Sequence, residues 1–434
     1  MKSRIQIYKE INTKTFLPKL LQFLKQENVF VILDSNAYKD KFSTFDFLCA
    51  WGIRAYFKET TELFDKLYKF HKVNKDWLFG HFSYDVKNYI EKLQSKNPDY
   101  IQFPEVFFFI PRYLVEIKDS FLIYNVFEED VLNIDLLHKN ILKLDYKKNT
   151  NHSKNLLFKK RMPKEEYFNK FQQIKKHIQL GDVYEFNFCQ EFYLENVIID
   201  SYDLFLSLKE KIPSPFSCLY RIEDKYLVCS SPERYLKKFG NTIISQPMKG
   251  TIKRSCDQSE DKKLYDLLRN SAKDISENVM IVDLVRNDLS RTAKKSTVEV
   301  LELCEVKSYP TVHQMISTIK SEINDGLPFT DVIKYSFPMG SMTGAPKIKA
   351  MELIDKYENT KRGLYSGTVG YITPSADFDF NVVIRSLQYN AKNKYASIIT
   401  GGAITVYSEV ENEYEECLLK AQGILSLLNA TIDD

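Results

Sequence analysis

Apolar and polar positions follow patterns that predict strands in the first third of the chain. Residues 5–8 alternate, residues 29–33 form a continuous apolar run typical of a buried strand, and residues 77–85 predict a strand that ends in a turn. Residues 100–110 are rich in aromatic side chains and predict a further strand. These segments predict structure and suggest no chemistry by themselves.

Helical spacing of apolar residues marks four segments in the rest of the chain. The predicted helices cover residues 168–180, 261–285, 348–357 and 414–428. The first stops at Gly181, the second at Arg286-Asn287-Asp288, and the third starts after Pro346. Residues 184–194 predict a strand. Because helices and strands do not alternate regularly, an α+β fold is favoured over a doubly wound sheet.

Length, composition and charge narrow the class of protein. The 434 residues are 44% apolar and 14% aromatic, so they can form a large core in two lobes or one large sandwich. The net charge of +3 gives no reason to expect a nucleic-acid partner. The start of the chain does not resemble a secretory signal, and no run approaches the ~20 apolar residues of a membrane span. The seven cysteines form no Cys-x-x-Cys pair, so we expect reduced thiols, a cytoplasmic location and no membrane.

The most basic and least periodic stretch lies between residues 143 and 164. Its cations include Lys147, Lys148, Lys154, Lys159, Lys160 and Arg161. Only Tyr146 and Phe158 interleave with them, so a solvated connector is favoured over a tail that stacks on nucleic-acid bases. We therefore predict an N-terminal lobe (1–150) that could carry a regulatory pocket, a basic connector (151–165) and a catalytic domain (166–434).

Two pairs of carboxylates have helical spacing. Asp274 and Glu277 lie three residues apart on one helix face, and so do Glu413 and Glu416, with Lys420 four residues further on. If the pairs face each other, they form an oxygen-rich site suited to Mg²⁺. Taken alone, each pair is more often a solvated group or a partner of the helix dipole.

Glycine-rich segments suggest places where a ligand could approach the backbone. The run 340–347 precedes a helix, but Pro346 and the lack of a Gly-Lys-Ser/Thr sequence exclude a P-loop; an anion could still bind at the helix start. Gly401-Gly402-Ala403 predicts a tight turn after a strand, either as plain turn geometry or as part of a site.

Three further side chains are candidates for nucleophilic or acid–base work. Lys249 stands beside Gly250 and an apolar neighbour, and burial there would lower the pKa of the amine enough for attack on an electrophile. Glu233 would serve as an acid if burial raised its pKa. The third candidate is His313. The structural alternatives are a surface lysine for Lys249, a solvated turn carboxylate for Glu233 and a structural histidine for His313.

In their order along the chain, these segments resemble the chorismate-utilising enzymes, which include anthranilate, aminodeoxychorismate, isochorismate and salicylate synthases. The resemblance spans residues 165–430 and is looser in the N-terminal third, where residues 77–85 fit best. It is carried by the runs 181–184, 231–233, 247–251, 271–284, 286–289, 337–347, 362–367, 384–385, 401–403 and 413–421. It implies an α+β fold built as a large two-lobed β-sandwich flanked by helices.

The resemblance also implies roles for individual residues. Glu277 and Glu416 match the family's metal ligands, with Asp274 and Glu413 as water-mediated partners, and the Mg²⁺ would hold the ring carboxylate of chorismate. Arg385 and Tyr365 match the positions that bind the enolpyruvyl carboxylate, and Gly402, Ala403 and Lys420 match the region around the ring carboxylate. Ser341 matches the hydroxyl of the glycine-rich turn, and His313 matches a histidine near the reacting ring.

Two positions separate the members of this family. The isochorismate and salicylate synthases carry a water-activating Lys where this chain has Glu185, and the aminating members usually carry Gln there. Members that make 4-amino-4-deoxychorismate have Pro-Ile-Lys-Gly-Thr around the position of Lys249, whereas anthranilate synthases have Ala. Lys249 therefore indicates the branch that leads to p-aminobenzoate and folate, while Glu185 has no explanation in the sequence.

The mechanism that the resemblance implies is covalent. Glu233 protonates the departing C4 hydroxyl, the amine of Lys249 attacks C2, and ammonia adds at C4 and expels Lys249. No nucleophile elbow of the Gly-x-Cys-x-Gly type is present, so ammonia would come from a separate glutaminase subunit. The alternatives are anthranilate synthase component I, which Lys249 disfavours, and a catalytically silent partner of the glutaminase that binds chorismate or tryptophan, which the intact carboxylates disfavour.

Overall fold

The computed structural model describes residues 4–146, 155–309 and 312–433. The α-helices are α1 Thr13–Leu24, α2 Leu63–Asn74, α3 Lys87–Ile90, α4 Ile134–Lys143, α5 Lys164–Gln179, α6 Ser201–Lys211, α7 Gln258–Arg269, α8 Ala272–Ser290, α9 Phe329–Ser336, α10 Lys347–Tyr357 and α11 Val410–Leu427. The strands are β1 Arg4–Glu10, β2 Val29–Asp34, β3 Phe47–Phe57, β4 Leu78–Phe82, β5 Val106–Lys118, β6 Phe121–Phe127, β7 Leu156–Lys160, β8 Glu185–Leu194, β9 Phe216–Ile222, β10 Lys225–Ser231, β11 Arg234–Phe239, β12 Thr242–Gln246, β13 Met248–Lys253, β14 Glu299–Ser308, β15 Val312–Glu322, β16 Gly344–Ala345, β17 Thr368–Ile372, β18 Phe378–Asn381, β19 Ser386–Asn390, β20 Tyr395–Ile404 and β21 Ala430–Ile432.

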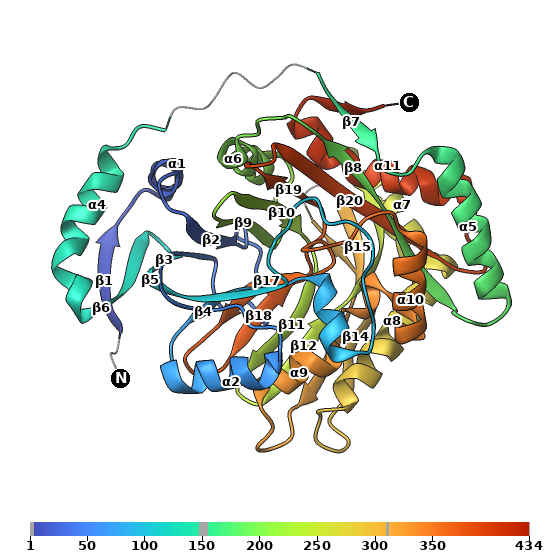
Figure 1. Cartoon of the computed structure of the whole chain (residues 1–434), viewed down its shortest axis with the longest axis horizontal. Helices are drawn as coiled ribbons and strands as arrows, with labels where there is room; N and C mark the ends of the chain where they lie inside the picture. Colours follow the sequence, from blue (N-terminus) through green and yellow to red (C-terminus); the bar gives the residue numbers. More distant parts are fainter. Residues whose placement is uncertain (1–3, 147–154, 310–311, 434) are drawn as a thin grey trace.

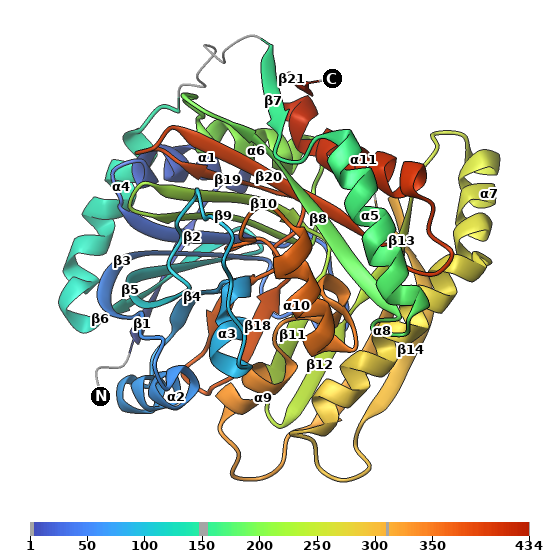
Figure 2. The same ribbon diagram turned by 45° about the vertical axis from the view of Figure 1, so that its right-hand side comes forward.

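The strands pair antiparallel in a sheet that folds back on itself, except that β21 pairs parallel with β7. One half runs β8-β20-β19-β10-β9-β2-β3, and the other runs β4-β17-β18-β11-β12-β15. The long strand β5 pairs with both β3 and β4 and so joins the halves. Helices lie around the outside of the strands (Figures 1 and 2). The predicted α+β sandwich flanked by helices is therefore confirmed.

Strand β2 shows why the two halves stack. Val29 and Val31 belong to an apolar cluster that also contains Phe79 of β4, so this cluster fills the space between the halves. Phe30 and Ile32, on the opposite face of β2, belong to a second cluster beneath helices. Because both faces of the strand are buried, residues 29–33 are apolar throughout instead of alternating.

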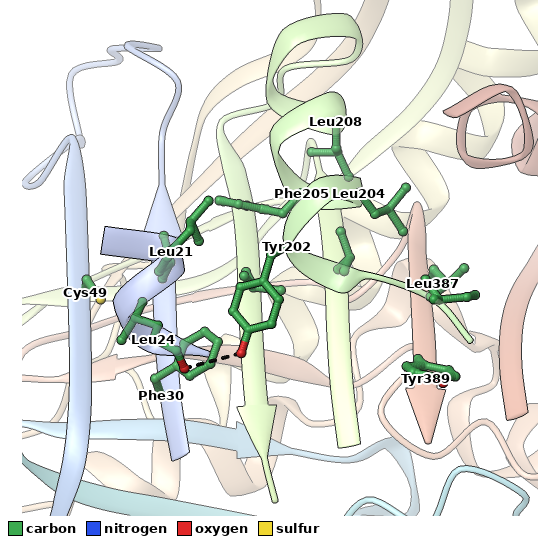
Figure 3. Close-up of a cluster of buried hydrophobic side chains, with 14 of the residues drawn as sticks. Leu21, Leu24, Phe30, Cys49, Tyr202, Leu204, Phe205, Leu208, Leu387 and Tyr389 are labelled. Atoms are coloured by element: carbon green, nitrogen blue, oxygen red, sulfur yellow. Dashed lines mark hydrogen bonds between the residues drawn. The ribbon is translucent and has the colours of Figure 1, made fainter. Parts of the chain in front are cut away.

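The outer cluster over β2 and β10 is packed by α1 and α6. Leu21 of α1 and Phe205 of α6 are fully buried in it, and Tyr389 of β19 closes one side (Figure 3). The Tyr202 hydroxyl donates a hydrogen bond of 3.3 Å to the carbonyl of Leu24, which ties the two helices together. Burial of each large apolar side chain contributes about 1.5–3 kcal/mol to the free energy of unfolding.

The segment predicted as one helix over residues 261–285 is two helices. Helix α7 ends at Arg269, and Ser271 then caps α8 by accepting a hydrogen bond of 3.3 Å from the backbone N–H of Asp274. The predicted stop near residue 286 is also wrong, since α8 continues to Ser290. The break places Asp274 in the first turn of α8, where a carboxylate complements the helix dipole.

The basic stretch is only partly a connector. Residues 156–160 form β7, which pairs with β8. Arg161 is not solvated as predicted, because its guanidinium lies 3.7 Å from the centre of the Tyr193 ring and its Nε donates to Glu191 at 3.0 Å. Lys147, Lys148 and Lys154 lie outside the described residues. Both sides of this stretch contribute to the same sandwich, since β2 pairs with β9 and β4 with β17.

Two shorter predictions also differ from the structure. Strand β5 begins at Val106 instead of residue 100, because the Asp99 carboxylate accepts backbone N–H bonds from Ile101 and Gln102 and holds a turn there. Gly401 and Gly402 lie inside strand β20 and do not form a tight turn. Across the described residues, no helix is long and apolar enough to cross a membrane.

Candidate active site

Most of the candidate side chains meet where β8, β13, α8 and α11 come together. Lys249 on β13 is close enough to interact electrostatically with three carboxylates: Glu185 at the start of β8, Glu277 on α8 and Glu416 on α11. Glu233, just before β11, lies in the range of Lys249 as well. One lysine is thus surrounded by carboxylates from elements that are far apart in the sequence.

Lys249 forms a buried ion pair with Glu185. Its Nζ lies 2.5 Å from Oε1 of Glu185, and the two side chains are 11% and 1% exposed. Burial lowers the pKa of Lys249, but the carboxylates of Glu185, Glu277 and Glu416 more than compensate and hold it above its usual range. The expectation that desolvation gives this amine a low pKa is therefore wrong for the free protein. The unexplained Glu185 has a physical partner in Lys249.

Glu233 has the environment that an acid catalyst needs. Burial raises its pKa to about 7, although the Ser341 hydroxyl, the Lys249 ammonium and the backbone N–H of Met248 each favour the charged form. The Ser341 hydroxyl donates to Oε1 of Glu233 at 2.7 Å. At neutral pH a large fraction of this carboxyl carries a proton, which suits proton donation to a leaving group.

One carboxylate from each pair lies beside Lys273. The Lys273 Nζ lies 3.1 Å from Oε1 of Glu413 and 3.9 Å from Oε1 of Glu277. Burial raises the pKa of Glu277 to about 7, against the opposing effect of Lys249. Glu277 Oε1 and Glu413 Oε2 are buried and have no hydrogen-bond partner among the described residues. These acceptors have room for a cation, which would relieve the cost of their burial.

The described side chains do not form a ready-made metal cage, however. In the part of the chain that the structure describes, no three His, Cys, Asp or Glu side chains are arranged to hold a metal ion. Lys273 contributes the positive charge between Glu413 and Glu277 instead. The donor set of carboxylate oxygens still fits Mg²⁺, since this ion takes few protein carboxylates together with water and substrate oxygens.

Two glycines let the backbone approach these carboxylates. A Cβ on Gly402 would lie 2.7 Å from Oε2 of Glu413, and one on Gly250 would lie 2.8 Å from Oδ1 of Asp274. Gly250 also has φ +80°, which disfavours other residues. The glycine at 402 is explained by this close approach within a strand, which is why the sequence pattern resembled a turn.

Lys420 and Ala403 lie near the same carboxylates. Lys420 donates to the carbonyl of Gly401 at 2.7 Å and lies 2.5 Å from Oε1 of Glu416. Burial raises the pKa of Glu416, but Lys420, Lys273 and Lys249 outweigh this effect and hold the pKa below its usual value. Ala403 is the next residue of β20 and pairs with Asn187 of β8.

Arg385 forms no ion pair with any residue that the structure describes. It adopts φ +50°, and among the described residues its guanidinium has neither an ion-pair nor a hydrogen-bond partner. Burial lowers the pKa of Arg385, while nearby Tyr365 and Glu416 raise it. The Tyr365 hydroxyl lies 3.7 Å from Sγ of Cys189 in the protein interior. A half-buried guanidinium that has no partner among the described residues is suited to a substrate carboxylate.

His313 is the candidate that the structure separates from the rest. Its Nδ1 lies 2.8 Å from the Ser308 hydroxyl and its Nε2 lies 3.0 Å from Asp261 of α7, and its ring packs edge-on against Tyr265. Both ring nitrogens are thus engaged. No contact joins His313 to Lys249 in the described structure.

The glycine-rich turn is fixed to β8 by a buried ion pair. Arg362 donates to both carboxylate oxygens of Glu358 at 2.6 and 2.9 Å, and also to the carbonyls of Met342 and Asn187. The side chains of Arg362 and Glu358 are 1% and 3% exposed. This network holds the turn that carries Ser341 against the strand that begins at Glu185.

We expect Arg362→Ala to lower the free energy of unfolding by about 3–5 kcal/mol, since it leaves the Glu358 carboxylate buried without its partner. Urea denaturation followed by circular dichroism measures the change. Lys349→Ala is the matched control: it removes an exposed pair with Glu352 and should cost less than about 0.5 kcal/mol. Equal effects of the two substitutions would contradict the role of the buried pair.

A sizeable cavity lies away from this centre. It measures about 260 Å³ and opens between the segment after β2 and strands β11 and β18; Tyr38, Arg234, Tyr309 and Asp379 are among its lining residues. None of the candidate site residues lines it. Arg234 is already paired with Asp379 and with Asp40.

The comparison with protein families matches residues 34–426 to the chorismate binding enzymes. The chain belongs to this family. Among its relatives, aminodeoxychorismate synthase component 1 of Escherichia coli (strain K12) is 39% identical over 267 residues, which are 62% of this chain and 58% of that protein. The protein of the same name from Bacillus subtilis (strain 168) is 30% identical over 357 residues, 79% of this chain and 74% of that protein.

A chloroplastic aminodeoxychorismate synthase of Arabidopsis thaliana is 40% identical over 263 residues, 60% of this chain. The match covers 28% of the length of the Arabidopsis protein and 58% of the length of the Escherichia coli protein, so this chain corresponds to only part of each relative.

Solved structures of other chorismate enzymes share the fold. Anthranilate synthase component I from Streptococcus pneumoniae TIGR4 has a TM-score of 0.77 at 24% identity, covering 89% of this chain and 95% of that one. The menaquinone-specific isochorismate synthase MenF from Escherichia coli has a TM-score of 0.75 at 15% identity, covering 99% and 95%. At these identities the likeness supports the sandwich and does not distinguish between reactions.

Two participants in the site of this chorismate binding enzyme were not among the residues singled out by sequence. Glu185 was noticed only as a departure from the expected Gln, because its partner Lys249 lies 64 positions away in the chain. Lys273 was given no role in the sequence analysis. Its position four residues before Glu277 was the available signal, since such residues share a helix face.

Proposed function

We propose that this protein aminates chorismate with ammonia and forms 4-amino-4-deoxychorismate. The single observation that carries the proposal is the burial of Lys249 at the centre of the candidate site, in contact with Glu185 and near Glu233. A buried lysine beside a carboxyl that is protonated near neutral pH combines a nucleophile with an acid. The names of the bacterial and plant relatives support the same reaction.

In the proposed reaction, the protein residues bind, protonate and attack. Arg385 and Tyr365 hold the enolpyruvyl carboxylate, since the Arg385 guanidinium has no hydrogen-bond partner within the described part of the chain. Glu233 gives its proton to the C4 hydroxyl, which leaves as water. The amine of Lys249 attacks C2 as the ring double bond shifts, and ammonia then attacks C4 and expels the lysine.

Magnesium is the cofactor that we propose for this site. Glu277 and Glu416 would hold the ion, with Asp274 and Glu413 acting through water, and Lys273 would withdraw from between them. When bound, Mg²⁺ would neutralise the ring carboxylate of chorismate and so favour its binding next to Gly402, Ala403 and Lys420. Ammonia would come from a separate glutaminase subunit. The word "component" in the relatives' names is consistent with such a partner.

The decisive experiment is incubation of the protein with chorismate, Mg²⁺ and an ammonium salt. Mass spectrometry and conversion by a separate lyase that releases pyruvate would identify 4-amino-4-deoxychorismate. Formation of fluorescent anthranilate instead would support the alternative, anthranilate synthase component I. Chorismate left unchanged while it binds would support a catalytically silent subunit.

We expect activity to be lost when Mg²⁺ is removed with a chelator and to return when it is added back. Glu277→Gln should raise the Mg²⁺ concentration needed for half-maximal activity by about 10–100-fold, since it removes one charged ligand. A titration of activity against Mg²⁺ measures this. Glu415→Gln, on the same helix as Glu416 but outside the candidate site, is the control. Full activity of the wild-type protein in excess chelator would contradict the metal assignment.

A further inference from the structure

Glu185 is a buried acid to which the reaction outlined above gives no task. Its side chain is 1% exposed, its Oε1 lies 2.5 Å from the Lys249 Nζ, and its Oε2 is buried without a hydrogen-bond partner in the described structure. A buried charge with a single partner depends on that partner for its stability. The state of Glu185 and the state of Lys249 are therefore linked.

Glu185 is close enough to exchange a proton with Lys249 directly. The carboxyls that face Lys249 are Glu185 on β8, Glu277 on α8, Glu416 on α11 and Glu233 before β11. Of these, Glu185 alone lies within hydrogen-bond distance of the Nζ in the described residues. Direct proton transfer requires hydrogen-bond contact between the heavy atoms or a bridging water, and the Nζ–Oε1 separation of 2.5 Å is such a contact.

The hydrogen bonds of Glu185 differ from those of a structural carboxylate. Glu358 accepts two hydrogen bonds from Arg362 and one from the backbone N–H of Cys189, which together stabilise its charged form. Glu185 has one donor, and that donor carries a transferable proton. An arginine in this position could not give its proton up, whereas a lysine can.

The backbone of Glu185 is held firmly. Its neighbours Tyr184 and Asn187 donate backbone hydrogen bonds to Ala345 and Thr343 of the glycine-rich turn at 2.7 and 2.9 Å. A Cβ on Gly344 would lie only 2.1 Å from the carbonyl oxygen of Glu185, so the turn packs directly on this residue. The carboxyl is thus presented to Lys249 by two backbone segments that are hydrogen-bonded together.

We propose that Glu185 is the base that takes a proton from the Lys249 ammonium before attack and returns it when the lysine is expelled. The inference rests on the proposed function, in which the Lys249 amine is the nucleophile. An ammonium has no lone pair and cannot attack C2. A lysine amine with an ordinary pKa of about 10.4 is almost fully protonated at neutral pH, so exchange with water supplies little amine, and the contact with Glu185 favours the charged form further.

The protons and electrons balance over the cycle. Transfer from Nζ to Glu185 converts an ion pair into a neutral amine and a neutral acid, so no net charge is created in the buried site. The amine lone pair forms the C2–N bond, the ring electrons shift, and the C4–O bond breaks as Glu233 supplies the proton of the departing water. Ammonia then forms the C4–N bond, the C2–N bond breaks with its electrons on Nζ, and Glu185 returns the proton to Lys249. The new C4 ammonium reprotonates Glu233.

The test compares Glu185→Gln with the wild-type protein. Glutamine keeps the shape and can still accept a hydrogen bond from Lys249, but it cannot take the proton. Each protein is mixed with chorismate and Mg²⁺ without ammonia, quenched over time, and analysed by intact mass for a covalent product of chorismate minus water. Rates are collected from about pH 6 to about pH 9. Glu195→Gln, an exposed carboxylate just past the other end of β8, is the matched control.

The ratio of the variant rate to the wild-type rate is the readout, because any dependence on Glu233 is common to both proteins and cancels. We expect Glu185→Gln to be slower by about 10²-fold near pH 7 and the ratio to rise about tenfold per pH unit, as the unassisted lysine loses its proton to water. For Glu185→Asp, the ratio of the variant rate to the wild-type rate should not change with pH, because aspartate can still take the proton from Lys249. A ratio for Glu185→Gln that does not change with pH would overturn the proposal.

The same experiment separates this inference from the proposed function. If the wild-type protein forms no covalent product and no 4-amino-4-deoxychorismate, then the proposed function is wrong. If it forms both and the Glu185→Gln ratio is independent of pH, then the function stands and Glu185 only positions Lys249.

Discussion

Lys249→Ala is expected to lower the rate of 4-amino-4-deoxychorismate formation on the order of 10³-fold, because the variant lacks the proposed nucleophile. Alanine also removes the cation that pairs with Glu185. The measurement is product formation from chorismate, Mg²⁺ and an ammonium salt, resolved by liquid chromatography and mass. With the lysine gone, ammonia has access to C2, so a small amount of anthranilate should appear.

The matched control is Lys253→Ala. Lys253 lies on the same strand β13, but it is exposed and belongs to no ion pair among the described residues. Its replacement should leave the rate and the product unchanged. If Lys249→Ala made the same product at the wild-type rate, the nucleophilic role of Lys249 would be refuted. Folding of the variant is checked by circular dichroism, since loss of one buried partner also costs stability.

Glu233→Gln is expected to slow the reaction by about 10²–10⁴-fold, since an amide cannot donate the proton that the C4 hydroxyl needs to leave. The pH dependence follows from the raised pKa of about 7 that burial gives Glu233. The acid form is present below pH 7 and disappears above it, so the wild-type rate should fall as the pH rises through about 7. Rates are compared at equal concentrations of free ammonia, because ammonium itself titrates.

The variant should lose this pH dependence together with the rate. Glu210→Gln, an exposed carboxylate on α6, should retain both the rate and the profile. A Glu233→Gln protein whose rate still fell above pH 7 would show that another group is the acid. In that case the buried hydrogen bond between Ser341 and Glu233 has only a structural role.

The sequence predicted the local parts of this molecule well. Residues 29–33 and 184–194 became strands β2 and β8, and residues 348–357 became α10, because burial pattern and a helix-start signal are local properties. The break between α7 and α8 was missed, although the Ser271 cap was visible, because apolar spacing continues across it. Gly401 and Gly402 appeared to form a turn. The strand has glycine at these positions because it closely approaches Phe188 and Glu413, which lie on other elements, so the sequence pattern alone could not show this.

The candidate site divides in the same way. The spacing of Asp274 and Glu277 could be predicted, since it is fixed by one helix. The contact between Lys249 and Glu185 could not, because it depends on how β13 and β8 are brought together by the folded sheet. The charge state of Lys249 was consequently predicted in the wrong direction: burial lowers its pKa as expected, but the surrounding carboxylates decide the result.

The pairing of early strands with late ones sets the order in which this protein can complete its fold during synthesis. Strand β2 finds its neighbour β9 only after the middle of the chain has been made, and β4 finds β17 only when synthesis is nearly finished. Until then these apolar strands have unpaired edges, which are prone to aggregation. The N-terminal strands therefore remain exposed to aggregation for longer than their own length would require.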